Sequence, residues 1–210
     1  MPSNRSSITV IVVLILWLLL ALSAGALGVT ARLVPPIPQA VLLGLVVIQL
    51  FTYAFYPGFR SWCMTVDLRA LVLFHITRFV GIYFLILYSR GRLPYDFAVP
   101  GGWGDIAVAI SAVLMAVYVK PEDKVGWSVY LLWNVLGLAD ILFVVFTATR
   151  LALSDPGSMA ELLGFPLSLL PTFVVPIIIF THVVIFARLY TAARRGYGHA
   201  RLSLYSAGSA

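Results

Sequence analysis

The stretch 71–88, LVLFHITRFVGIYFLILY, is apolar enough to cross a lipid bilayer, yet it carries His75 and Arg78. A charged side chain at that depth costs at least about 2.5–3.5 kcal/mol, so Arg78 requires a partner or a water-filled cavity. His75 and Arg78 are three residues apart and therefore share one face of a helix. We interpret the remaining apolar segments as the helices that surround Arg78.

The composition is that of a membrane protein. The chain has 210 residues, of which 61% are hydrophobic and 10% are charged, and its mean hydropathy is +1.01. A soluble domain has about 45–50% apolar and about 25% charged residues. Several separate apolar runs have the length of about 20 residues that spans a bilayer as a helix. The predicted fold class is therefore an all-α, polytopic integral membrane bundle that forms one transmembrane domain over residues 1–195.

Six predicted spans account for these runs. Small residues along the first span favour a retained helix, while a cleaved signal peptide of residues 1–26 stays an open alternative. The segment 160–170 is apolar but too short to cross, so we expect it to be interfacial or re-entrant. Residues 196–210 are predicted to form a loosely ordered cytoplasmic tail. The spans cover approximately residues 8–29, 37–56, 68–88, 103–119, 127–149 and 172–193.

The basic residues predict the orientation of the spans. Six spans place both termini on one side, and nine lysines and arginines lie on that side against four on the other. Because cytoplasmic loops carry the excess of Lys and Arg, we expect both termini in the cytoplasm, with the protein in a bacterial inner membrane. This bias and anionic lipids explain the net charge of +6, so no nucleic-acid partner is indicated.

Polar side chains from three predicted spans fall at one depth. At a rise of 1.5 Å per residue, Arg78, Asp140 and His182 lie near the middle of the membrane. His75 and Asn134 lie slightly closer to the cytoplasm. A buried guanidinium needs a nearby carboxylate, so we predict an Arg78–Asp140 ion pair. Such a pair marks either a polar pocket or proton path, or a purely structural contact that fixes helix register.

Asp105 and Pro176 extend the set of candidate features. The run Gly101–Gly104 is read as a loop, so Asp105 is predicted to cap the helix that follows or to lie at the mouth of a site. We accordingly expect Asp140→Asn to reduce stability or function more than Asp105→Asn does. Pro176 lies inside the last span and leaves the carbonyl of Thr172 without its helical partner.

Three classes of function are compatible with these residues. The first is a small transporter or a proton- or ion-linked membrane protein, with Asp140 as proton carrier, Arg78 as its counter-charge and His182 as a relay. A conventional pathway would then require a homo-oligomer or a larger membrane complex. The second is a non-catalytic accessory subunit, or a membrane protein that binds a lipid or apolar ligand. The third is a b-type haem protein with His75 and His182 as axial ligands.

No catalytic residue is predicted, and an enzymatic role is not indicated. The sequence has no P-loop, GxSxG, HExxH or CxxC motif. The single cysteine, Cys63, excludes an internal disulfide and a cysteine-rich metal site. No metal or cofactor is predicted outside the haem alternative, and the lipid bilayer is the one partner that follows from the sequence.

Overall fold

The computed structural model describes the backbone of residues 4–120 and 124–207, and the side chains of residues 7–120 and 125–194. All regular secondary structure in the described backbone is helical. Six helices are long and apolar enough to cross a membrane, which confirms the predicted all-helical class and the number of apolar spans. These helices are Ser7–Ala26, Ile37–Phe55, Leu68–Ser89, Tyr95–Tyr118, Val125–Ser154 and Leu170–Arg194.

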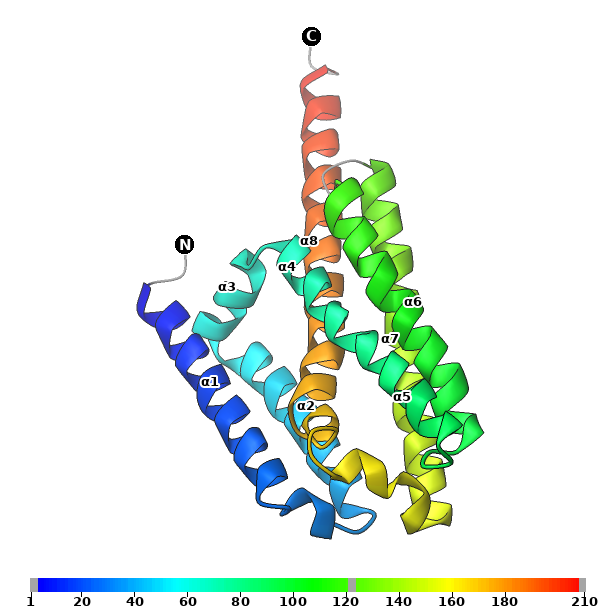
Figure 1. Ribbon diagram of the computed structural model, residues 1–210. Coiled ribbons are helices and arrows are strands. Elements are labelled where there is room, and N and C mark those ends of the chain that lie inside the picture. Colours follow the sequence, from blue (N-terminus) through cyan, green and yellow to red (C-terminus); the bar gives the residue numbers. More distant parts are fainter. Residues whose placement is uncertain (1–3, 121–123, 208–210) are drawn as a thin grey trace.

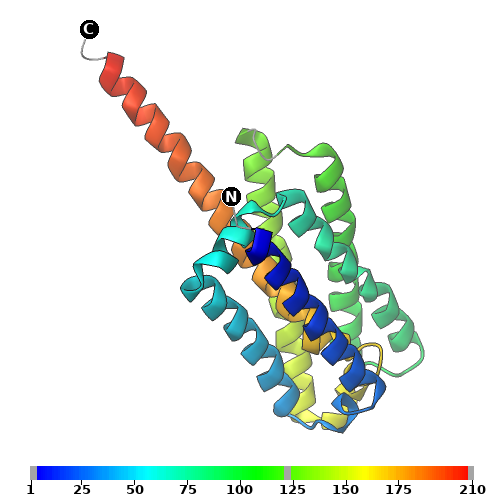
Figure 2. The ribbon, with the colours of Figure 1, turned by 90° about the vertical axis from the view of Figure 1, so that its left-hand side faces the viewer.

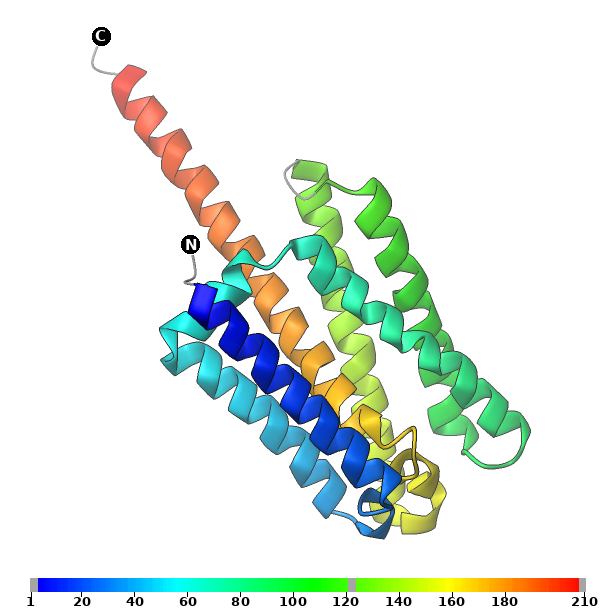
Figure 3. The ribbon, with the colours of Figure 1, turned by 60° about the vertical axis from the view of Figure 1, so that its left-hand side comes forward.

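The long helices form two groups with the last helix between them. Helices α1 and α2 lie on one side, and α5, α6 and α7 lie on the other (Figure 3). Helix α8 lies between the groups and contacts both α2 and α7. It also extends beyond the other helices at the end of the bundle where α1 begins (Figures 1 and 2). The bounds are α1 Asn4–Ala26, α2 Ile37–Phe55, α3 Pro57–Thr65, α4 Leu68–Leu73, α5 Val80–Ser89, α6 Tyr95–Tyr118, α7 Lys124–Ser154 and α8 Val175–Ala207.

The third span is interrupted at its centre. Between α4 and α5 the backbone forms a 3₁₀ helix, η2 (Phe74–Phe79). Side chains three residues apart eclipse one another in a 3₁₀ helix. His75 and Arg78 therefore point the same way, and both are buried, at 0% and 1% exposed. The interruption thus directs the two polar residues of this span into the bundle.

Short irregular helices close one end of the bundle. The connection after α7 contains a 3₁₀ helix, η3 (Pro156–Leu163), whose Glu161 carboxylate accepts two hydrogen bonds from Arg92 at 2.9 and 2.6 Å. The hydroxyl of Thr30, in the 3₁₀ turn η1 (Thr30–Arg32), donates to the carbonyl of Leu163 at 2.8 Å. These contacts hold η3 across the end of the bundle, and no part of the segment 160–170 crosses the bundle.

The last span begins with a π-helical turn, η4 (Leu170–Val174), that leads into α8. The indole N–H of Trp17 donates to the Thr172 carbonyl at 2.8 Å. This is the carbonyl that Pro176 leaves without a helical donor, so α1 supplies the hydrogen bond that the proline removes. The contact joins the first and last spans.

The two largest differences from the sequence-based spans are in α6 and α8. Helix α6 begins at Tyr95 rather than near residue 103, and it includes Pro100 and the run Gly101–Gly104. Pro100 lies inside the helix and leaves the carbonyl of Asp96 without its helical donor. Helix α8 continues to Ala207, into the stretch 196–210 for which a loosely ordered tail was predicted. Residues 208–210 of that stretch lie outside the described residues.

Candidate functional site

Arg78 is bonded to three acceptors from two neighbouring helices. Its Nε donates to Oδ1 of Asp105 at 2.6 Å, and its Nη2 donates to Asp140. Its Nη1 donates to the backbone carbonyl of Gly137 at 3.0 Å. The predicted Arg78–Asp140 contact is therefore present, but a second carboxylate faces the same guanidinium. We call Arg78, Asp105 and Asp140 the ion cluster.

The position of Asp105 corrects a prediction. Asp105 does not cap a helix, because α6 begins ten residues earlier at Tyr95 and Asp105 lies in its interior, 3% exposed. The error came from reading Gly101–Gly104 as a loop. Both carboxylates bind Arg78. There is therefore no longer a reason to expect Asp140→Asn to reduce stability or function more than Asp105→Asn does.

Glycines allow the helices of the ion cluster to approach closely. A Cβ atom on Gly102 would lie 2.9 Å from the carbonyl oxygen of Gly81, so α5 and α6 are in backbone contact at this point. A Cβ atom on Gly104 would collide with the carboxylate of Asp140. Only glycine provides this clearance. The run that was read as a loop therefore serves to bring α6 against α5 and α7.

The ion cluster contains two carboxylates for one guanidinium. With all three groups ionised, the cluster carries one excess negative charge, and burial makes such a charge costly. Asp140 is the accessible member, because its side chain is 21% exposed, whereas those of Asp105 and Arg78 are 4% and 1% exposed. Asp140 is therefore the less buried of the two carboxylates.

A second polar group, the histidine cluster, comprises His75, Trp133, Asn134, Thr181 and His182. The side-chain amide N–H of Asn134 donates to the backbone carbonyl of His182 at 3.0 Å, which fixes the orientation of the amide. Oδ1 of Asn134 therefore accepts the hydrogen bond from Nδ1 of His182 at 2.7 Å. The Thr181 hydroxyl donates to a backbone carbonyl at 2.8 Å and therefore accepts from Nε2 of His75 at 3.2 Å. Each histidine thus has one ring nitrogen occupied.

The rings of the histidine cluster pack against one another. The centroids of His75 and His182 are 4.4 Å apart, and Trp133 lies edge-on to His75 at 5.0 Å. Nδ1 of His75 and Nε2 of His182 are buried without a hydrogen-bond partner among the described residues. Gly137 joins the two clusters, since its carbonyl binds Arg78 and an added Cβ would lie 2.8 Å from Cε1 of His182.

This arrangement does not fit a haem. Bis-histidine ligation places an iron and the porphyrin plane between two ring nitrogens. His75 and His182 are in ring contact at 4.4 Å, which leaves no space for that plane, and Nε2 of His75 is engaged by Thr181. Nor do the described residues include a group of three or more His, Cys, Asp or Glu side chains that could hold a metal ion.

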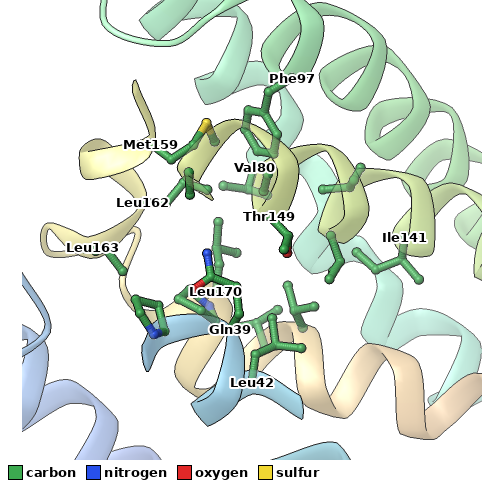
Figure 4. Close-up of a pocket in the computed structure, with 18 of the residues that line it drawn as sticks. Gln39, Leu42, Val80, Phe97, Ile141, Thr149, Met159, Leu162, Leu163 and Leu170 are labelled. Atoms are coloured by element: carbon green, nitrogen blue, oxygen red, sulfur yellow. The ribbon is translucent and has the colours of Figure 1, made fainter. Parts of the chain in front are cut away.

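An apolar cavity of about 160 Å³ borders the ion cluster. Residues from α2, α5, α6, α7, η3, η4 and α8 form its walls (Figure 4). Arg78, Asp105 and Thr77 also line it, so the charged groups contact a mostly apolar space. Sequence reasoning did not identify this cavity, because its walls come from helices far apart in the chain. Apolar members of the walls include Leu42, Val80, Ile141, Val145, Ala148 and Met159.

The fold and these clusters define an all-helical protein with six helices of membrane-spanning length and polar groups buried between them. The chain belongs to the family described as Domain of unknown function (DUF8737), which matches residues 35–190. The match includes both clusters and the cavity. No curated protein and no solved structure matches the chain.

Proposed function

We propose that this protein is a polytopic membrane protein in which the ion cluster binds and releases one proton at Asp140, as part of a small transporter or another proton-linked membrane function. The observation that carries the proposal is the single buried guanidinium of Arg78 bonded to two carboxylates. One bound proton makes the cluster electrically neutral, which favours its position between apolar helices.

The geometry supports exchange at Asp140 without loss of the site. When Asp140 is protonated, Arg78 keeps its contacts with Asp105 at 2.6 Å and with the Gly137 carbonyl at 3.0 Å. The guanidinium therefore stays paired in both states. Gly137 also lies against the His182 ring, whose Nε2 is buried without a hydrogen-bond partner among the described residues. His182 is the candidate relay.

The charge distribution supports an orientation with both termini in the cytoplasm of a bacterial cell. The end of the bundle at which α1 begins carries most of the basic residues, and two of the four arginines at the η3 end are paired with acids. Arg92 there binds Glu161, and Arg150 contacts Asp96 at 3.2 Å. The bias of Lys and Arg toward cytoplasmic loops then places the η3 end outside.

Proton flux in liposomes tests the proposal. The purified protein is reconstituted with an internal pH-sensitive dye, and a potassium diffusion potential drives protons inward. We expect flux above that of protein-free liposomes, loss of this flux in Asp140→Asn, and its retention in Asp96→Asn. Asp96 is a matched control because it is an exposed aspartate outside both clusters.

An absence of flux in the unmodified protein would reject proton transport. The accessory-subunit alternative would then be favoured, with a homo-oligomer or a larger membrane complex as the assembly to seek. Flux that persists in Asp140→Asn would contradict the assignment of Asp140. The alternative of an apolar-ligand-binding protein has independent support in the cavity beside Arg78.

A further inference from the structure

The cavity is long relative to its volume. Its lining residues on α7 run from Ile141 to Ala152, which is about 16 Å of helix at 1.5 Å per residue. Figure 4 shows Met159, Leu162 and Leu163 at one end and Ile141 at the other. The elongated shape and the apolar walls, rather than the volume, favour a hydrocarbon chain over a compact ring.

The walls also present one unsatisfied polar atom. Oε1 of Gln39, in the first turn of α2, is buried without a hydrogen-bond partner among the described residues. Gln39 lines the cavity, and Figure 4 places it beside Leu42 and Leu170. The oxygen and nitrogen of a glutamine amide are assigned from their surroundings. A hydroxyl group satisfies either atom, because it both donates and accepts.

We propose that this cavity binds a long-chain alcohol, a single hydrocarbon chain with one hydroxyl group, taken from the surrounding bilayer. The hydroxyl group binds the amide of Gln39, and the chain lies along α7 between Ala152 and Ile141. The apolar chain excludes water from the side of Arg78 that faces the cavity. This proposal does not depend on proton exchange at Asp140, because it rests on the cavity and on Gln39 alone.

Photo-crosslinking tests the proposal. The probe is a decanol analogue with a diazirine near the end of its chain, added to the full-length protein in phosphatidylcholine liposomes, and crosslinked residues are mapped by peptide mass spectrometry. We expect crosslinks on the cavity walls, at Val145, Ala148 or Met159. Crosslinks confined to lipid-exposed positions such as Leu132 and Phe146 would overturn the proposal.

A cavity-filling variant provides a matched comparison. Ala148→Phe places a ring in the cavity and is expected to reduce the wall crosslinks at least several-fold. Ala54→Phe makes the same change at an exposed position of α2 and is expected to leave them unchanged. Equal crosslinking in a folded Ala148→Phe protein and in the unmodified protein would contradict the proposal.

The hydroxyl group is tested separately, so the result does not depend on the folding of Ala148→Phe. The unmodified protein is expected to crosslink the alcohol several-fold more than the corresponding diazirine alkane, and Gln39→Leu is expected to lose this preference. Equal crosslinking of both probes in the unmodified protein would overturn the role of Gln39. Wall crosslinks that persist in Asp140→Asn, whatever its proton flux, would confirm that the two proposals stand independently.

Discussion

The buried guanidinium of Arg78 requires hydrogen-bond acceptors and negative charge on the helices around it. Its guanidinium is 1% exposed and donates to Asp105, to Asp140 and to the carbonyl of Gly137. Bonds to charged partners are stronger than neutral ones, and removal of one partner leaves the other charge buried without compensation. The stability of the bundle and the chemistry of the site therefore depend on the same side chain.

At this position we expect Arg78→Leu to lower the free energy of unfolding by about 3–5 kcal/mol, because two buried carboxylates lose their counter-charge. The double variant Arg78→Leu/Asp105→Asn is expected to recover part of the loss, since one of those charges is removed. Denaturant unfolding of the protein in detergent measures both changes. Unchanged stability of Arg78→Leu would contradict the description of the ion cluster.

Cys63 gives a prediction outside the six spans. It lies in α3, is 2% exposed, and burial raises the pKa of its thiol from 9.0 to about 12. Because only the thiolate reacts rapidly, N-ethylmaleimide is expected to label the folded protein much more slowly than the unfolded protein. Above pH 9 the unfolded thiol ionises first, so the free energy of unfolding falls as pH rises. Equally fast labelling in both states would contradict this burial.

At the scale of single residues, the sequence predicted part of the site. Counting along the helices placed Arg78 and Asp140 at one depth, because most of each span rises by the 1.5 Å per residue of an α-helix. Asp105 was named as a candidate but given the wrong role, since its depth depends on where α6 begins. The contacts of Trp133 and Thr181 with His75 depend on how α7 and α8 pack against η2, and no local signal in the sequence specifies that packing.

At the scale of elements, the contact between α5 and α6 depends on glycine. We expect Gly102→Ala to lower the free energy of unfolding by about 1–3 kcal/mol, because its methyl group meets the Gly81 carbonyl at 2.9 Å. Gly44→Ala, with no atom within 4 Å of the added Cβ, is the matched control. The control is expected to be neutral or to raise stability by up to about 1 kcal/mol. Equal effects in thermal unfolding would show that the helices do not meet at Gly102.

The existence of the six long helices was predictable, and their interruptions were not. Apolar runs of membrane length indicate helices regardless of what surrounds them. By contrast, the 3₁₀ helix at Phe74–Phe79 and the π-helical turn at Leu170–Val174 depend on tertiary contacts. The hydrogen bond from Trp17 to Thr172 is one such contact, and it joins residues 155 positions apart.

At the scale of the whole molecule, the orientation in the membrane follows from the number of spans and the basic residues. In a Cys63→Ser background, we expect a membrane-impermeant maleimide to label Ser89→Cys in intact spheroplasts but to label Ser61→Cys only after permeabilisation. Both serines are exposed. Ser61 lies in α3, before the third span, and Ser89 lies at the other end of that span. The reverse pattern would invert the topology, and labelling of both in intact spheroplasts would contradict six spans.

The proposed function depends on whether the ion cluster exchanges a proton. Infrared difference spectroscopy of the protein in lipid, recorded from mildly acidic to mildly alkaline pH, observes protonated carboxyl groups directly. We predict a carboxyl band that changes with pH, disappears in Asp140→Asn and remains in Asp96→Asn. A spectrum with no pH-dependent carboxyl band, or with a band that persists in Asp140→Asn, would contradict proton exchange at Asp140 and leave the ion cluster with a structural role.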